Sequence, residues 1–493
     1  QIITPRGLHS IPPSLINIFF PLFHICPSLL HNSKTIYNFV TAVIITMVTK
    51  MKFYNRTSEI EELRRIQARA FESRSRMTVI TGRRRIGKTS LALRATQGAG
   101  PTVYLFVSRK NEAALCEEFA GLVTSTLGCF VPPELKSFKS LFRLLMEFGR
   151  THKFNLIIDE FQEFFNINPS VFSDMQNLWD VYHNHTHVNL LLMGSVYSMM
   201  HKIFESYHEP LFGRADAIIR LNGFGTETLK EIMQDFRPGY TNDDLLALYC
   251  ITGGVPKYIE LLCEDTDLSV NGMIDYIVRE NSLFINEGRT LLIEEFGKDY
   301  GLYFSVLNCI ASGINTQGAI ENALGGVTVA GHLKRLIEDY SIIRRLRPIM
   351  SKPRSQNVQY EITDNFLKFW FNYFDRNQTL VELNNFERLR EIIKADYLTF
   401  SGHALEKWFR LRMMESREYS DIGSWWERKK GRDANEIDIV GLKTDGRTAL
   451  LAEVKRQCRN YDHKLFMQKV ERIKVCLLDK HRIETKLFTL EDM

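Results

Sequence analysis

The stretch Gly82–Thr89, GRRRIGKT, constrains the fold of this 493-residue chain more than any other segment. It follows a short β-rich run, Met77–Thr81, and precedes SLALRA, which has helical spacing. A glycine-rich loop of this spacing between a strand and a helix is typical of a phosphate-binding P-loop. Glycines allow backbone N–H groups to turn towards phosphates, and the helix N-terminus adds partial positive charge. We therefore expect an α/β fold that binds a nucleoside triphosphate here.

The positions of this loop have distinct expected roles. Lys88 should reach the β- and γ-phosphates of ATP, and the hydroxyl of Thr89 should bind Mg²⁺. We expect the side chains of the three loop arginines to be solvated. The remaining positions expected to contact the nucleotide are Gly82, Arg83, Arg84, Arg85, Ile86, Gly87 and Ser90.

An acidic residue at the end of a second buried strand would complete such a site. The run FNLIIDEF places Asp159 and Glu160 directly after apolar residues. Asp159 would orient Mg²⁺ through its water shell, and Glu160 would polarise the attacking water. A third apolar run, VNLLLMGS, ends at Ser195, whose hydroxyl could sense the γ-phosphate. Arg214 could complete the site in its own subunit or in a neighbouring one, or it could be a surface arginine.

Six blocks of the sequence occur in the order seen in archaeal-type ATPases. They are FYNRTSEIEELRRI, the P-loop, LIIDEF, LLLMGS, PLFGRADAI and TGGVPKYI. Over residues 51–290 the chain therefore resembles this group, which belongs to the AAA+/STAND-like branch of P-loop NTPases. The resemblance implies a five-stranded parallel sheet with helices on both faces. It also implies that Phe53 and Arg56 lie near the adenine.

The part of the chain that follows this core shows the spacing of apolar residues that is typical of helices. Residues 226–295 predict a helical lid over the nucleotide. Residues 296–375 show three helical stretches and then β-like segments, which is the layout of a winged helix-turn-helix. In its candidate recognition helix, TVAGHLKRLIEDY, the residues His332, Lys334 and Arg335 could face a phosphate backbone. A winged helix that packs only against protein is the alternative.

Two β-like runs near the C-terminus, ANEIDIVGL and TALLAEVKRQ, carry a second candidate site. Because residues two apart on a strand share a face, Glu453 and Lys455 should point the same way, and Asp438 lies on the preceding strand. With Glu406 on an upstream helix, the pattern resembles the PD-(D/E)xK nuclease fold over residues 395–480. The resemblance implies that Asp438 and Glu453 hold Mg²⁺ and that Lys455 positions the attacking water. An ordinary hairpin with solvated charges is the alternative.

These observations predict an α/β protein of five segments. Pro, His and Asn interrupt the apolar runs near the N-terminus, which favours a leader over a membrane segment of about 20 apolar residues. The segments are an extraneous or disordered leader (1–50), a P-loop NTPase αβα core (51–225), a helical lid (226–295), a winged helix-turn-helix (296–375) and a restriction-endonuclease-like α/β domain (376–493).

Composition sets loose limits on the function. The formal net charge of +5 permits contact with nucleic acid without arguing for it. The eight cysteines form no CxxC pair, so we expect the reduced, mostly buried thiols of a cytoplasmic protein. The sequence therefore predicts a Mg²⁺-dependent ATPase that acts as a nucleotide-regulated switch. Its candidate partners are double-stranded DNA, another protein or a second copy of the chain, and we expect no membrane partner. The alternative is an ATP-dependent scaffold or signalling protein whose C-terminal domains bind protein only.

Overall fold

The computed structural model describes residues 52–297, 300–352, 354–427 and 435–493. The predicted leader, residues 1–50, lies outside the described residues. The chain divides into two compact units, Gln1–Phe53 and Tyr54–Met493, and every element named below belongs to the second. Within the described ranges, no helix is long and apolar enough to cross a membrane.

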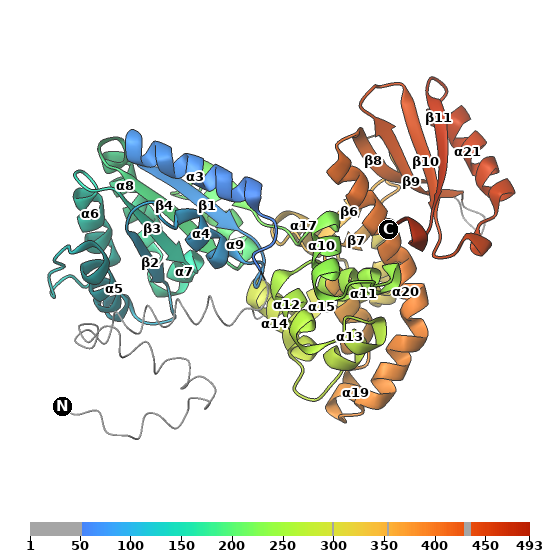
Figure 1. Ribbon diagram of the computed structural model, residues 1–493, viewed down its shortest axis with the longest axis horizontal. Coiled ribbons are helices and arrows are strands. Elements are labelled where there is room, and N and C mark those ends of the chain that lie inside the picture. Colours follow the sequence, from blue (N-terminus) through green and yellow to red (C-terminus); the bar gives the residue numbers. More distant parts are fainter. Residues whose placement is uncertain (1–51, 298–299, 353, 428–434) are drawn as a thin grey trace. The chain divides into compact units, whose positions relative to one another are not determined.

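A parallel sheet holds the N-terminal part of this unit together (Figure 1). Its strand order is β2-β3-β4-β1-β5, and every neighbouring pair is parallel. Strands β3 and β4 are buried at every residue, as continuous apolar runs predict for strands covered on both faces. The predicted five-stranded parallel sheet is therefore confirmed. The strands are β1 (Arg76–Thr81), β2 (Thr102–Phe106), β3 (Phe154–Asp159), β4 (Val188–Gly194) and β5 (Ala217–Arg220).

Helices cover both faces of this sheet. One face packs against α3 (Thr57–Glu72) and α4 (Lys88–Thr96). Here the buried side chain of Asn155 on β3 accepts hydrogen bonds from Gln67 of α3 (2.6 Å) and Asn189 of β4 (2.9 Å). The other face packs into a wholly apolar cluster. Its helices are α5 (Glu112–Leu127), α6 (Phe138–Phe148), α7 (Phe164–Ile167), α8 (Ser170–Tyr182) and α9 (Tyr197–Glu205), with short turns at Phe161–Glu163 and His183–His185.

The middle of the chain is helical, apart from one short strand pair. Helix α11 (Asn242–Thr252) is buried at every residue from Asp244 to Thr252, and a capping box at Thr241 begins it. Strands β6 (Ile343–Leu346) and β7 (Gln359–Ile362) pair antiparallel. The other helices are α10 (Thr226–Phe236), α12 (Pro256–Asp265), α13 (Val270–Ile277), α14 (Leu283–Phe296), α15 (Tyr300–Ala311), α16 (Gln317–Ala323), α17 (Ala330–Glu338), α18 (Asn365–Trp370), a π-turn at Phe371–Asp375 and α19 (Gln378–Glu382).

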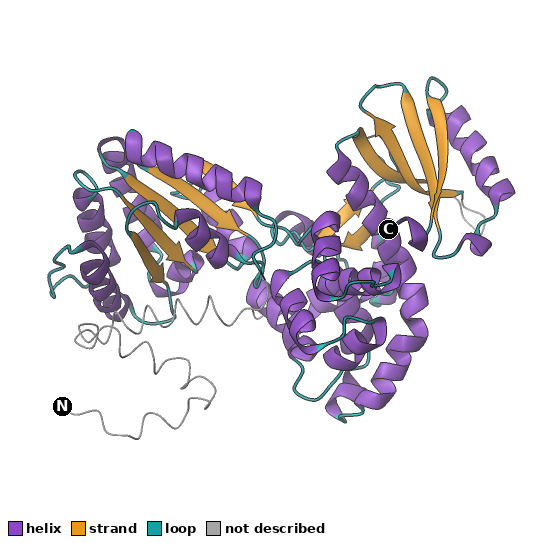
Figure 2. Cartoon of the chain, viewed as in Figure 1, coloured by secondary structure: helices purple, strands orange, loops and turns teal. Residues whose placement is uncertain are grey.

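The C-terminal part combines a long helix with a four-stranded sheet of order β11-β10-β9-β8 (Figure 2). Strands β8, β9 and β10 pair antiparallel, whereas β10 and β11 are parallel. A parallel pair needs a crossover connection, and α21 provides it. Its apolar face packs into the sheet through Phe466, Val470 and Ile473. The elements are α20 (Phe386–Ser416), β8 (Tyr419–Trp426), β9 (Glu436–Lys443), β10 (Thr448–Val454), α21 (His463–Leu477) and β11 (Arg482–Phe488), with short turns at Cys458–Asn460 and Leu490–Asp492.

One ion pair joins the end of β10 to the start of α11. Arg456 lies 2.8 Å from Asp243, at the first turn of α11, and also donates to the hydroxyl of Ser401 on α20 (2.6 Å). Its guanidinium lies 5.5 Å from the ring of Tyr397, whose hydroxyl donates to the same aspartate. Because the arginine side chain is only 12% exposed, this contact is an integral part of the packing.

The cysteines differ from the expectation. The seven cysteines in the described residues are all free. Only two of these, Cys116 and Cys250, are buried, so the expectation that most of the thiols are buried is wrong. Burial raises the pKa of both thiols to about 12. Cys458 and Cys476 are exposed, because one lies in a surface turn and the other on the outer side of α21.

A glycine substitution tests how α14 packs on α18. A Cβ added at Gly288 would lie 2.3 Å from the Trp370 ring, so Gly288→Ala should lower the free energy of unfolding by about 1–3 kcal/mol. Gly402→Ala, in α20, is the control, because its Cβ meets nothing within 4 Å. At this position the higher helix propensity of alanine should raise the free energy of unfolding by about 0.5–1 kcal/mol. Urea titrations followed by circular dichroism measure both, and equal midpoints would contradict the close approach of α14 to Trp370.

Candidate active site

Three strand ends bring the predicted site residues to one edge of the sheet. Thr81, the last residue of β1, pairs with Gly194 of β4, and Ile158 of β3 pairs with Leu192 of the same strand. The P-loop, Asp159 and Ser195 therefore leave neighbouring strands side by side. Ligands of parallel α/β sheets bind at this carboxyl edge.

The backbone of the P-loop requires glycine at two positions. Gly82 has φ 153° and Gly87 has φ 90°, values that side chains disfavour. A Cβ at Gly82 would also lie 2.8 Å from the carbonyl oxygen of Leu221. Lys88 begins α4 and donates through Nζ to the carbonyl oxygens of Gly82 (2.8 Å) and Arg83 (3.2 Å). Burial lowers the pKa of Lys88, and the carboxylates of Glu160 and Asp159, at the end of β3, oppose this shift.

The carboxylate of Asp159 is held by three donors. The Thr89 hydroxyl (2.7 Å) and the Tyr104 hydroxyl (2.8 Å) donate to Oδ2, and the backbone N–H of Glu160 donates to Oδ1 (2.9 Å). A hydroxyl in contact with a carboxylate is an oxygen pair of the kind that Mg²⁺ uses. The two residues therefore fit a magnesium ion. Tyr104 was missed, because an aromatic residue on a strand has no pattern that marks it as part of a site.

Glu160 and Ser195, predicted from separate strands, are hydrogen-bonded to each other. The Ser195 hydroxyl donates to Oε2 of Glu160 (2.7 Å), and Nε2 of Gln162 donates to the same oxygen (2.6 Å). The glutamate has φ 53°, a left-handed backbone that non-glycine residues adopt at some energetic cost. This backbone turn and the two donors fix the direction of its carboxylate. Gln162 is a second residue that the sequence pattern did not identify.

The expectation that the three loop arginines are solvated is wrong for Arg83 and Arg85, whose side chains are 22% and 21% exposed, whereas Arg84 is exposed. Each forms an ion pair with an acidic residue at least about 200 positions later in the chain, on α14 or just before α18. The guanidinium of Arg83 also lies 5.5 Å from the ring of Tyr258. These partners are invisible to local pattern because of their sequence separation. The three pairs are Arg83–Asp364, Arg84–Glu294 (2.7 Å) and Arg85–Glu287 (2.7 Å).

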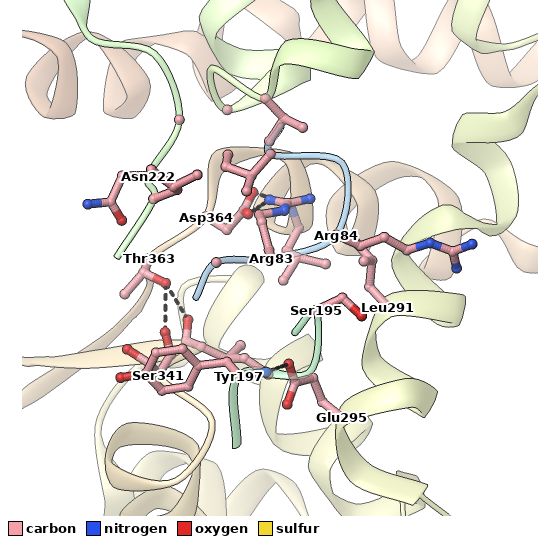
Figure 3. Close-up of a pocket in the computed structure, with 18 of the residues that line it drawn as sticks. Arg83, Arg84, Ser195, Tyr197, Asn222, Leu291, Glu295, Ser341, Thr363 and Asp364 are labelled. Carbon is pink, nitrogen blue, oxygen red and sulfur yellow. Dashed lines mark hydrogen bonds and ion pairs between the residues drawn. The ribbon is translucent and has the colours of Figure 1, made fainter. Parts of the chain in front are cut away.

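A cavity of about 440 Å³ opens beside the loop (Figure 3). Its walls come from the P-loop, residues 195–197, residues 220–224, α14 and the segment before α18. At one wall, the carboxylate of Glu295 accepts hydrogen bonds from the backbone N–H of Tyr197 (2.7 Å) and the hydroxyl of Ser198 (2.8 Å). Burial raises the pKa of Glu295. The volume is that of a small-molecule site.

Of the remaining predicted residues, some lie beside the cavity and others do not. Arg56 is buried next to the cavity wall: it donates to the carbonyl of Asn222, and its guanidinium lies 5.3 Å from the Phe224 ring. Arg214 instead donates to the carbonyl of Phe212 and pairs with Asp180 of α8 (3.2 Å). Ile86, within the loop, is buried, and Ser90 is exposed on α4. Phe53 belongs to the unit Gln1–Phe53, and its role stays a prediction.

The C-terminal acids also converge. Nζ of Lys455 lies 2.9 Å from Oε1 of Glu453 and 3.7 Å from Oδ2 of Asp438. A second lysine, Lys469 of α21, lies 3.3 Å from Glu453. Glu406 of α20 pairs with Arg410 (3.2 Å). Glu453 is 7% exposed and the Asp438 side chain 14%, so the two acids of this hairpin are largely shielded from solvent, whereas the Lys455 side chain is 31% exposed.

Electrostatics at this second cluster follow from burial and from crowded carboxylates. Burial, with the nearby charges of Glu406 and Glu453, raises the pKa of Asp438 to about 7. Burial alone would lower the pKa of Lys455, but the surrounding carboxylates outweigh it and raise that pKa. Among the residues that the structure describes, no group of three or more His, Cys, Asp or Glu side chains is placed to hold a metal ion.

Comparisons with known proteins agree with the P-loop geometry. Residues 53–262 match a family described as an ATPase domain predominantly from Archaea. Residues 370–466 match a family of archaeal and bacterial proteins of unknown function. An uncharacterised protein of Methanocaldococcus jannaschii is 29% identical over 458 residues, which is 88% of this chain and 98% of the relative.

One solved structure shares the fold. A Walker-type ATPase of Pyrococcus abyssi is 19% identical, with a TM-score of 0.51 over 65% of this chain and 96% of its own. The ORC2 protein of Aeropyrum pernix, solved in ADPNP–ADP complexes, is 14% identical over 70% of this chain and 96% of its own. Its TM-score of 0.44 is too low to support an inference. The family match identifies residues 53–262 as an ATP-binding domain, and the chain is an ATPase.

Proposed function

We propose that the chain is a Mg²⁺-dependent ATPase whose nucleotide state switches its C-terminal segments, and that these segments act on DNA. The convergence of Asp438, Glu453 and Lys455 at the ends of β9 and β10 carries the second half of this proposal. Burial and the neighbouring carboxylates raise the pKa of Asp438 to about 7, and such perturbed groups cluster at functional sites.

In the proposed ATP site, each group has one task. The loop backbone and Lys88 would hold the phosphates, and Thr89 with Asp159 would hold Mg²⁺. When bound, the ion supplies positive charge beside the phosphate oxygens. Glu160 would accept a proton from the attacking water, and its hydrogen bond from Ser195 would orient it for this.

We also propose that residues 296–375 form a winged helix. Three helices followed by an antiparallel strand pair support this assignment. On its third helix, α17, the side chain of Lys334 is 69% exposed and available to a phosphate. His332 and Arg335 lie on the same helix, and the guanidinium Nη1 of Arg335 donates to the Tyr303 hydroxyl (3.5 Å).

The C-terminal domain is proposed to be a PD-(D/E)xK fold. Asp438 and Glu453 would hold Mg²⁺, and Lys455 would position water at a phosphodiester bond. Glu406, whose charge raises the pKa of Asp438, supports a shared acidic site. The backbone N–H of Val454 donates to Oδ2 of Asp438 (2.8 Å), which keeps the two strands' acids in register.

The test is a DNA-binding and cleavage assay with and without ATP and Mg²⁺. We expect affinity for double-stranded DNA that falls steeply with salt, because released counterions drive such binding. We expect binding to change between the ADP-bound and ATP-bound protein. Absence of DNA binding at low salt would reject the DNA proposal and favour a scaffold. The Lys334–Glu338 pair (3.7 Å) on α17 is the observation that favours that alternative, because it reduces the positive charge available to DNA.

An aspartate substitution separates the two proposed sites. Asp438→Ala should lower Mg²⁺-dependent DNA cleavage at least about tenfold, because one of two metal-binding carboxylates is lost. ATP hydrolysis should stay unchanged, since Asp438 lies in the C-terminal sheet. Asp421→Ala, an exposed aspartate of β8, is the control. Equal cleavage by wild type and Asp438→Ala would show that the nuclease activity belongs to another site or to a contaminant.

A further inference from the structure

Four acidic residues contact the loops of the ATPase site from outside the sheet. We call them the acidic clamp: Glu287, Glu294 and Glu295 of α14, and Asp364, which caps the N-terminus of α18. Figure 3 shows Asp364 against Arg83, and Glu295 against Tyr197. The clamp therefore touches both the P-loop and the turn that follows Ser195.

Two of these contacts are largely shielded from solvent. The side chains of Arg83 and Asp364 are 22% and 17% exposed, and those of Arg85 and Glu287 are 21% and 3% exposed. The Arg84–Glu294 pair is more open, at 44% and 32%. Shielded pairs are screened weakly by salt, so the first two have the stronger effect on the loop.

Both shielded acids are fixed by further hydrogen bonds. The hydroxyl of Tyr258 donates to Glu287 (2.9 Å), and the backbone N–H of Leu367 donates to Asp364 (3.2 Å). The carboxylates therefore point at the loop whichever way the arginines turn. Arginine forms its strongest pairs with carboxylates and with phosphates, and it binds both through the N–H groups at the edge of the guanidinium.

Phosphates at the P-loop would meet this arrangement as competing anions. Arg83 and Arg85 lie on the loop that the phosphates would occupy, and each already neutralises a carboxylate. A phosphate beside Glu287 or Asp364 would be repelled unless these acids move away or lose their charge. The two kinds of anion therefore exclude each other at the same arginines.

We propose that the acidic clamp is an intramolecular competitor of the nucleotide phosphates for Arg83 and Arg85. This inference rests on the proposed ATP site and adds its regulation. Binding of ATP loosens α14 and α18 from the P-loop. Because coupling between two sites is reciprocal, weakening the clamp strengthens ATP binding by the same factor.

The experiment measures the affinity of the full chain for Mg-ATP and Mg-ADP by isothermal titration calorimetry. Glu287→Gln and Asp364→Asn keep the hydrogen-bonding shape and remove the charge, and asparagine still caps a helix. Each should bind Mg-ATP at least about fivefold more tightly than wild type. Glu294→Gln, at the open pair, should show a smaller gain. Glu260→Gln is the matched control, since its acid pairs with Lys257 (2.7 Å) and not with the loop.

A second measurement covers the case in which a buried substitution unfolds the protein. Hydrogen exchange of wild type should speed up in residues 283–296 and 365–370 when Mg-ATP is added. Slower or unchanged exchange there would overturn the proposal, as would equal or weaker affinity in folded Glu287→Gln and Asp364→Asn. If wild type fails to bind Mg-ATP, the proposed ATP site is wrong. If wild type binds Mg-ATP normally and the clamp variants bind it no more tightly, only the competition proposal is wrong.

Discussion

Lys88→Ala should lower ATP turnover by at least about 100-fold and weaken Mg-ATP binding, because the substitution removes the ammonium that we expect to face the phosphates at the P-loop. The lysine is buried at the start of α4, where its Nζ contacts two loop carbonyl oxygens. No other lysine of the loop can replace it, since the loop's remaining cations are arginines held by carboxylates. A coupled phosphate-release assay measures turnover, and calorimetry measures binding.

The control for this loss is Lys110→Ala. That lysine pairs with Glu118 on the surface, and its side chain is 51% exposed. We expect wild-type turnover from it. Circular dichroism of Lys88→Ala should match wild type, because alanine is a strong helix former. Normal binding and hydrolysis in a folded Lys88→Ala variant would show that ATP is processed at another place.

Glu160→Gln should keep Mg-ATP binding and lose hydrolysis by a factor of about 100 to 10,000, which is the range for loss of a general base. Glutamine is nearly the same shape, and its amide oxygen can still accept from Ser195 and Gln162. Only the ability to take a proton from water disappears. Single-turnover hydrolysis and calorimetry on the same sample separate the two effects.

A neighbouring acid provides the comparison. Glu163 pairs with Arg109 (2.9 Å), so Glu163→Gln alters a carboxylate close in sequence without touching the Ser195 hydrogen bond. It should hydrolyse ATP at the wild-type rate. Glu160→Gln that loses binding and hydrolysis in equal proportion would assign this glutamate to nucleotide binding.

Local pattern was sufficient for the sheet and its loop. Continuous apolar runs mark strands that are buried on both faces, and the P-loop motif connects one of them to a helix. Both signals lie within about 15 residues, where sequence and structure are directly linked. The same holds for Asp159 and Glu160, since residues that end a buried strand must emerge at the edge of the sheet.

Partners far apart in the chain could not be predicted in this way. Arg84 and Glu294 are 210 positions apart, and no periodicity connects them. A run of arginines beside a loop is typical of a solvated surface, so the expected exposure failed at Arg83 and Arg85, which are partly buried against distant acids, and held at Arg84. Tyr104 was missed for a related reason, since its partner Asp159 lies on another strand. Gln162 was missed although its partner Glu160 is only two residues away, because no motif marks the glutamine. The domain boundaries and the role of Arg214 stay predictions.

Helix α11 has a mechanical consequence. Its 11 residues make a rod of about 16 Å, and packing encloses it from Asp244 to Thr252. One end carries Asp243, bound to Arg456 just beyond β10, and the other ends at Gly253, which lines the cavity beside the P-loop. A close-packed interior is stiff, so an enclosed rod cannot absorb a displacement by bending. Gly253 at the cavity and Arg456, which is next to Lys455 in the chain, are therefore joined by a single stiff element.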